Sequence, residues 1–278
     1  MGNIFVFGYQ NEASGKTTIS IALARALADE GINVGVFKPV SAHNFWYQYD
    51  HTLRNSEAKT LFCEDVYKLT KAAKTSAPLQ LLNPVDRLIS QPNIEKYAAP
   101  SPIDRILLER ITSYEDGIKD TYLRNESTRE TLLYQREVLE TICEGKETKR
   151  CNSFGEWDAV ERDLLSNAIS TCYNHLCNEN EIVLAESYNN EVPFLLPDIE
   201  HAMLIAPGRI FIYDAVDFRE CFEVNASTKG RTLGEDVFKQ IKAEYIIELS
   251  PLRRVQLEDY DFLAREIGKP LLETLGVL

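Results

Sequence analysis

The chain has 278 residues, of which 44% are hydrophobic, so it is long enough to bury a large core. It carries 43 acidic and 30 basic side chains, and this negative balance argues against general affinity for nucleic acid or anionic membranes. There is no run of 18 apolar residues and no basic leader, so we expect neither membrane insertion nor secretion. The six cysteines show no metal-ligand spacing, which favours reduced thiols in the cytoplasm.

The first predicted elements are a strand over residues 4–7, a loop, and a helix from about Ile19. The loop reads GYQNEASGKTT, so Gly-Lys-Thr stands between a strand and a helix. In a phosphate-binding loop of this kind, backbone N–H groups surround a phosphate, Lys16 contacts the outer phosphates and the Thr17 hydroxyl can ligate magnesium. The candidate nucleotide-binding residues are Asn11, Glu12, Ala13, Ser14, Gly15, Lys16, Thr17 and Thr18.

This loop departs from the usual pattern at one position. A glycine normally stands six residues before the lysine, where this chain has Gln10, and Gly8 comes two residues earlier. The alternative interpretation is a Gly-Lys-Thr sequence that merely starts a helix. We favour nucleotide binding, because the residues that contact phosphate and metal are kept and follow an apolar strand.

The elements that follow predict an α/β fold. After Gly31 the apolar residues 34–40 predict a second strand, and a strand, helix and strand in succession imply a parallel sheet. Further strands are predicted at 182–187, 202–206, 210–213 and 245–249, and helices at 233–243 and 257–267, the last ended by Gly268. The sequence therefore predicts one doubly wound, mostly parallel sheet.

The middle of the chain has a different pattern, with apolar residues at helical spacing in a charged background. Three stripes predict three helices: Ile103, Ile106, Leu107 and Ile111; Leu132, Leu133 and Leu139; and Val160, Leu164, Leu165 and Ile169. We thus expect a single α/β domain over residues 1–278 with a helical insertion at about 101–177. This insertion either closes the sheet or contacts a second subunit, or it forms a lid over the nucleotide.

Two charged residues at strand ends are candidates for the other half of the site. Glu186 follows four apolar residues of a predicted central strand, where an acid is costly to bury unless it meets a cation or a hydrogen-bond network. Lys38 interrupts the apolar residues 34–40 at the sheet edge where ligands of open α/β folds bind. Both could instead be solvated strand-end residues.

The order of these motifs resembles dethiobiotin synthetase, a P-loop NTPase. That family carries GKT, then YKPV, then LRNSDA, then VEGAGG, and this chain has GKT, FKPV, LRNSEA from Leu53 to Ala58, and Ala185-Glu186-Ser-Tyr-Asn-Asn190. The FKPV strand is also similar to the N-terminal domain of some phosphotransacetylases and to cobyrinic acid diamide synthases. The resemblance covers residues 1–92 and 181–192. It lacks the glycine run that follows the glutamate in the family.

The resemblance implies specific roles. Thr17, Glu57 and Glu186 would hold Mg²⁺, and Lys16 and Lys38 would act catalytically on the phosphates of ATP. The implied activity is ATP- and Mg-dependent phosphorylation of a carboxylate or carbamate on a small molecule, a ligase-type reaction in a cytoplasmic homodimer.

Two other functions remain open at this point. One is a nucleotide-binding regulatory or interaction module without its own small-molecule substrate, which the lost glycine run favours. The other is a partitioning ATPase, which fits the Thr17-Thr18 pair but lacks that group's signature lysine, because position 11 is Asn11. Among the remaining residues, Asp214 and Asp217 are either acids near the site or helix caps, and the aromatic residues 45–49 either stack on a base or pack in a loop.

Overall fold

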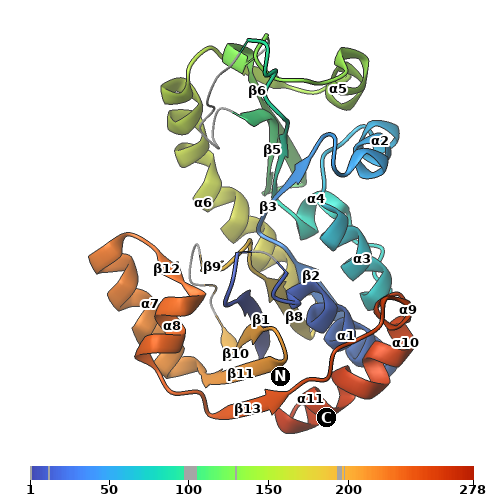
Figure 1. The fold of residues 1–278 in the computed structure, drawn as a ribbon, viewed down its shortest axis with the longest axis vertical. Helices are drawn as coiled ribbons and strands as arrows, with labels where there is room; N and C mark the ends of the chain where they lie inside the picture. The colour runs from blue at the N-terminus through green and yellow to red at the C-terminus, as the bar shows by residue number, and fades with distance from the viewer. Residues whose placement is uncertain (1, 12, 97–104, 129, 193–195, 197) are drawn as a thin grey trace. The chain divides into compact units, whose positions relative to one another are not determined.

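The structure is a computed structural model that describes residues 2–11, 13–96, 105–128, 130–192, 196 and 198–278. The chain divides into two compact units (Figure 1). The first unit contains residues 1–39, 68–77 and 176–278, and the second contains residues 40–67 and 78–175. Each unit has its own sheet, so each is described by itself.

The first unit is built on a six-stranded mixed sheet. Its strands are β1 (Asn3–Gly8), β2 (Val34–Phe37), β8 (Ile182–Glu186), β10 (Ile199–Ala206), β11 (Arg209–Asp214) and β13 (Tyr245–Glu248), in the order β13-β11-β10-β1-β8-β2. The four strands β2, β8, β1 and β10 are parallel, and β11 and β13 add two antiparallel pairings. The predicted strands of this unit are therefore confirmed, except that the strand expected over 34–40 ends at Phe37 and Val40 begins a strand of the second unit. β1 lies at the centre of the sheet.

Helices cover both faces of this sheet. Its helices are α1 (Lys16–Asp29), α7 (Ala215–Lys229), α8 (Gly234–Gln240), α9 (Arg254–Leu257), α10 (Tyr260–Leu263), η3 (Ala264–Gly268) and α11 (Lys269–Thr274). Phe5 and Phe7 point to one face of β1, where both rings contact Phe218 of α7. α1 packs on β1 as well, and η3, α10 and α11 pack against α1. A short ribbon of β9 (Glu191–Val192) and β12 (Thr232–Leu233) completes the unit.

Gly268 does not end a helix, so this prediction was wrong. The helical residues continue through Gly268 into α11, and Pro270 lies in the first turn of α11, where proline is tolerated. A Cβ atom at Gly268 would lie 2.1 Å from the Ala22 carbonyl oxygen of α1. The glycine is needed because the two helices approach closely there.

The second unit contains a five-stranded sheet in the order β3-β4-β5-β6-β7. Its elements are β3 (Val40–Asn44), α2 (Tyr49–Ala58), α4 (Leu79–Leu82), β4 (Val85–Ile89), β5 (Ile106–Tyr114), β6 (Ile118–Asn125), η2 (Glu126–Thr128), α5 (Arg136–Cys143) and β7 (Thr148–Cys151). Two helices, α3 (Glu64–Ala73) and α6 (Phe154–Glu179), cross the division between the units. The core contains Phe45, Leu61, Leu88, Leu107, Leu108, Tyr122, Leu132, Leu139 and Ile142.

The helix expected over residues 103–111 is wrong for its described part. Residues 103 and 104 lie outside the described residues, and Ile106 to Tyr114 form β5, paired with β4 and β6. As a central strand, β5 is buried over seven consecutive residues, so its apolar positions do not alternate. The charged residues Glu109 and Arg110 give residues 103–111 the sequence pattern of an amphipathic helix, although both are buried. The segment about 101–177 is thus only partly helical, in α5 and α6.

Within the part of the chain that the structure describes, no helix is both long and apolar enough to cross a membrane. Asp214 is the N-cap of α7, where its carboxylate accepts hydrogen bonds from the backbone N–H groups of Val216 and Asp217. Of the two interpretations of Asp214, the helix cap is confirmed.

Candidate functional site

The loop between β1 and α1 has a backbone shape suited to an anion. Gly15, which precedes the first residue of α1, has a φ of 93°, and Ala13 has a φ of 55°. Left-handed residues at alternate positions are part of the backbone pattern that turns successive N–H groups toward one concave side. Gly15 is exposed and no described side chain caps the helix, so the N-terminal end of α1 offers donors to an anion.

Lys16 is held over this loop. Its side chain is buried, and its Nζ lies 3.4 Å from the Oγ of buried Ser14. The same Nζ lies so close to Gly8 that a Cβ atom on Gly8 would be 2.9 Å from it. A larger residue at position 8 would therefore displace the ammonium group, which gives Gly8 a spatial role although it is outside the usual loop pattern.

Three side chains from three different segments converge at the same edge of the sheet. In the register of the sheet Val6 pairs with Glu186, and Phe37 pairs with Ala185, so the ends of β1, β8 and β2 are adjacent. The Thr17 hydroxyl donates to Glu186 Oε1 over 3.0 Å, and Lys38 Nζ donates to the same oxygen over 2.5 Å. Glu186 is fully buried and Lys38 is only 4% exposed.

The second carboxylate oxygen of Glu186 indicates where a cation or a hydrogen-bond donor could bind. Glu186 Oε2 is buried and has no hydrogen-bond partner among the described residues. A buried carboxylate oxygen without a partner is costly, so it indicates a place for a cation or a donor. Its neighbour, the Thr17 hydroxyl, is also an oxygen ligand of the kind that magnesium prefers. The residues present therefore fit a magnesium ion completed by water and phosphate oxygens.

No group of three or more His, Cys, Asp or Glu side chains among the described residues is arranged to hold a metal. Magnesium does not require such a group, because it usually keeps several waters and binds through one or two protein ligands plus substrate phosphates.

An apolar pocket of about 320 Å³ opens beside the phosphate loop. Most of its lining comes from loops that follow strands at this sheet edge. The lining comprises Ala13, Ser14, Gly15, Thr18, Ile19, Ile205, Ala206, Pro207, Gly208, Leu249, Ser250, Pro251, Leu252, Leu257 and Ile267. The described residues of this lining include no charged side chain, so the pocket suits a flat, uncharged ring.

The start of α8 packs directly on the start of the loop. A Cβ atom on Gly234 would lie 2.0 Å from the Gly8 carbonyl oxygen, so only glycine fits there. The Gly234 N–H donates to Asn190 O, and the preceding β12 pairs with β9. The segment that follows Glu186 is thus fixed in a ribbon next to the loop.

The predicted site residues have different outcomes. Thr17 and Lys38 both contact Glu186 in the first unit, and Lys16 contacts Ser14 in the loop, while their catalytic and metal-binding roles stay predictions. Glu57 lies on α2 in the second unit, where it is exposed, and its metal-binding role stays a prediction. Glu12 lies outside the described residues. Asn11 and Ala13 are exposed in the loop, and Thr18 lines the apolar pocket.

Asn55, in the motif that resembles the synthetase, has a structural role. Its Oδ1 accepts a hydrogen bond from Phe62 N, and its Nδ2 donates to His51 O and Phe62 O. It therefore fixes the turn after α2.

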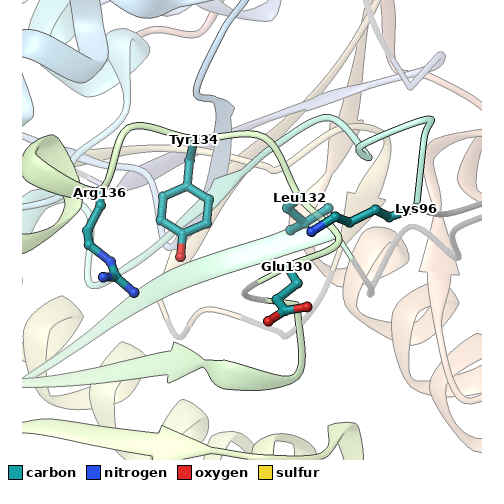
Figure 2. Close-up of a pocket in the computed structure, with 5 residues that line it drawn as sticks. All are labelled: Lys96, Glu130, Leu132, Tyr134 and Arg136. Carbon is teal, nitrogen blue, oxygen red and sulfur yellow. The ribbon is translucent and has the colours of Figure 1, made fainter.

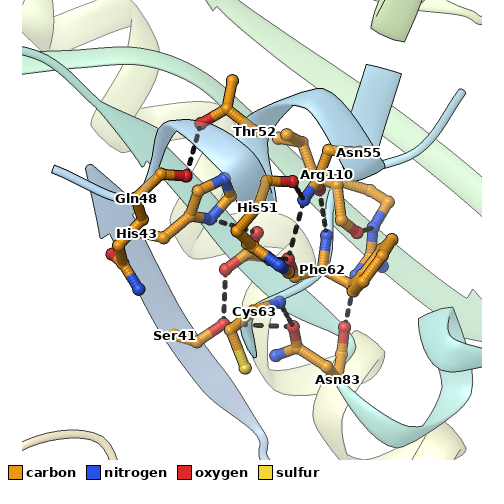
Figure 3. Close-up of polar contacts among 12 residues, drawn as sticks. Ser41, His43, Gln48, His51, Thr52, Asn55, Phe62, Cys63, Asn83 and Arg110 are labelled. Atoms are coloured by element: carbon orange, nitrogen blue, oxygen red, sulfur yellow. Dashed lines mark hydrogen bonds and ion pairs between the residues drawn. The ribbon is translucent and has the colours of Figure 1, made fainter. Parts of the chain in front are cut away.

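A buried polar cluster lies beside Asn55 in the second unit (Figure 3). The Asp86 carboxylate accepts from Ser41 Oγ over 2.5 Å and lies 3.0 Å from His43 Nδ1. His51 Nε2 lies 2.5 Å from Phe62 O, and its ring meets that of His43 edge to face. Burial lowers the pKa of His51, and adjacent His43 lowers it further.

Sequence reasoning missed the pocket-lining loops and Gly234. Pro207-Gly208 and Ser250-Pro251 each follow a strand that ends at the ligand edge, and that position was the available signal. Gly234 gave no such signal, because its role depends on a carbonyl more than 200 residues earlier in the chain.

No protein-family model, curated protein or solved structure matches the chain.

Proposed function

We propose that this protein is an ATP- and magnesium-dependent enzyme that phosphorylates a carboxylate or carbamate oxygen of a small molecule. The observation that carries the proposal is Glu186, whose one carboxylate oxygen is shared by Thr17 and Lys38 while the other has no hydrogen-bond partner in the described part of the chain. Groups that bind a phosphate, a metal and a second anionic group meet there. A protein that only binds nucleotide has less need of a second buried lysine.

The chain supplies positioning and charge neutralisation for this reaction. The loop amides and Lys16 bind the β- and γ-phosphates, and Thr17 with Glu186 would hold the magnesium ion, which neutralises phosphate charge when bound. The acceptor oxygen attacks the γ-phosphorus, and the bond between that phosphorus and the oxygen of the leaving ADP breaks. Lys38 lies at the sheet edge where the phosphates and the anionic substrate would bind, and it would orient the acceptor oxygen of that substrate.

The pocket beside the loop supports adenine as the base. A guanine presents N–H donors that proteins commonly pair with an acid, and the polar side chains among the described lining residues are only the hydroxyls of Ser14, Thr18 and Ser250. An apolar pocket rejects a charged group but accepts a flat ring by burial. ATP therefore fits better than GTP.

A second candidate function is a nucleotide-binding regulatory module without a small-molecule substrate. It is favoured by the segment after Glu186, where the family that the chain resembles has a glycine run. Here Glu191 and Val192 are paired with β12, and Asn190 accepts a hydrogen bond from Gly234. A segment tied in this way is less open to a second substrate.

The test separates binding from turnover. Mg·ATP binding is measured by calorimetry and phosphate release by a continuous assay, with 7,8-diaminopelargonate plus bicarbonate as one substrate pair. Lys16→Ala and Glu186→Gln should lose binding or turnover, whereas the exposed control Lys242→Ala should keep both. Binding without turnover for any carboxylate tested would favour the module. Full ATP binding by Lys16→Ala would overturn both functions.

A further inference from the structure

A pocket in the second unit gathers opposite charges over an apolar floor. It has a volume of about 640 Å³ and is lined by Lys96, Glu130, Leu132, Tyr134 and Arg136 (Figure 2). Leu132 belongs to the core of this unit, and Tyr134 packs against that core. The floor is thus fixed, and the charged side chains surround it.

The two walls of the pocket are hydrogen-bonded to each other. Asn93 N donates to Thr131 O, Leu133 N donates to Gln91 O, and Pro92 and Leu132 form an antiparallel bridge. Lys96 N in turn donates to Asn93 O. The segment that carries Lys96 is therefore held in register with the segment that carries Glu130, Leu132 and Tyr134.

Donors outnumber acceptors in this pocket. Lys96 and Arg136 form no ion pair with any described residue, although the chain has 43 acidic and 30 basic side chains. Figure 2 shows the Tyr134 hydroxyl directed toward the space that Arg136 and Glu130 flank. Arg136 is also the first residue of α5, and Gln135 before it makes no side-chain cap, because its Oε1 accepts from Tyr49 instead. Glu137 is the acidic residue of this first turn, and an anion bound beside Arg136 would also face the positive end of the helix.

We propose that this pocket binds an organic anion, a phosphate or a carboxylate attached to an apolar group. The anion contacts Arg136 and Lys96, the Tyr134 hydroxyl donates to it, and the apolar part covers Leu132 and the Tyr134 ring. Glu130 is the only acceptor among the five side chains that is charged, so it selects ligands that also carry a hydroxyl or amine. The pocket residues all belong to the second unit, and the proposal does not depend on the proposed function.

The experiment uses the full-length protein with ¹⁵N-labelled backbone amides. Phenyl phosphate and benzoate are titrated as probes, with benzyl alcohol as the neutral control, and the shifts of residues 130–136 are followed. We expect saturable shifts with at least one anion and none with benzyl alcohol. A response to phenyl phosphate alone assigns the site to phosphate esters, and a response to benzoate assigns it to carboxylates.

The variants test the charges in opposite directions. Lys96→Gln and Arg136→Gln should each weaken the probe about tenfold, the size expected for one charge-assisted hydrogen bond. Glu130→Gln should tighten it, because these probes have no donor for the carboxylate. Lys119→Gln, an exposed lysine of the same unit, should change nothing. Unsaturable shifts, or affinity unchanged by Arg136→Gln, overturn the proposal.

Discussion

Lys38 and Glu186 form an ion pair, with 2.5 Å between Nζ and Oε1, in which both side chains are almost completely buried. The two residues are 148 positions apart, and parallel pairing of β2 with β8 brings them together. Burying such a pair costs solvation on both sides, and the attraction only offsets that cost when both partners are present.

Removing one partner should therefore cost more than removing both. Glu186→Gln should destabilise the protein by about 3–5 kcal/mol, because it removes the carboxylate charge that faces the buried Lys38 ammonium. Adding Lys38→Met should recover most of that loss. Urea unfolding of the wild type, both single variants and the double variant measures the coupling. Strictly additive losses would show that the pair is not coupled.

Gly234→Ala should weaken nucleotide binding through the loop. Its Cβ atom would meet the Gly8 carbonyl at 2.0 Å, so β1 and the loop must shift. A shift on the scale of 1 Å in a binding site lowers activity by up to about 100-fold. Calorimetric titration with Mg·ATP measures the change.

Gly35→Ala is the matched control, because the nearest atoms to its Cβ would belong to the side chain of Asn180, whose amide group can rotate away. We expect Gly35→Ala to bind Mg·ATP as the wild type does. Equal affinity in both variants would mean that α8 does not position the loop.

Filling the apolar pocket should weaken binding of the base without weakening binding of the phosphates. Ala206→Phe places a ring among Ile205, Pro207 and Leu249, so ATP should bind at least about tenfold more weakly, a loss of about 1.4 kcal/mol. Magnesium tripolyphosphate has no base, and its affinity should stay unchanged. Competition between the two ligands gives both constants. Parallel loss of tripolyphosphate would place the damage in the loop rather than in the pocket.

Stability should fall on mild acidification because of His51. Burial lowers the pKa of His51 below 6.5, so below that pH the unfolded chain takes up a proton that the folded chain resists. The stability contributed by neutral His51 is present above pH 6.5 and is lost as the pH falls through the folded-state pKa. His51→Gln should flatten unfolding free energy against pH between about 7 and 5.

His175→Gln is the control for this profile, because His175 stacks on Tyr114 outside the cluster. Burial also lowers the pKa of His201 on β10, so the slope should shrink in His51→Gln without vanishing. An unchanged slope would contradict the assignment.

At lower pH a second group, the Asp86 carboxylate, adds to the loss of stability on acidification. Burial favours protonated Asp86, but His43, Ser41 and Arg110 outweigh it and hold the pKa of Asp86 below 3.8. Its contribution is present above pH 3.8 and disappears as the pH falls through the folded-state pKa.

The parts predictable from the sequence were those with local signals. The apolar residues 4–7, the glycine of the loop and the helix from Lys16 lie within 26 residues, and each is specified by its neighbours in the chain. Glu186 and Lys38 were found because a charge at the end of an apolar strand is conspicuous. Their contact followed from parallel strand geometry.

The parts that failed depend on residues distant in sequence. Glu109 and Arg110 look solvent-facing in the sequence, but Glu109 pairs with Arg87, and Arg110 donates to Leu61 O and Asn83 O. These partners allow charged residues inside a central strand. For this reason β5 was not recognised as a strand in the sequence. Gly268 was read as a helix end for the same reason, since its close neighbour Ala22 lies on another helix.

The central position of β1 also determines which strands of the sheet unfold locally. β1 is hydrogen-bonded to β8 on one edge and β10 on the other, whereas β13 has a described partner on one edge only. Amide hydrogens of β1 should therefore exchange with solvent only when the whole unit unfolds, and those of β13 through local fraying. A molecule in which the edge strand β13 has frayed would still keep β1, the strand from which the phosphate loop starts.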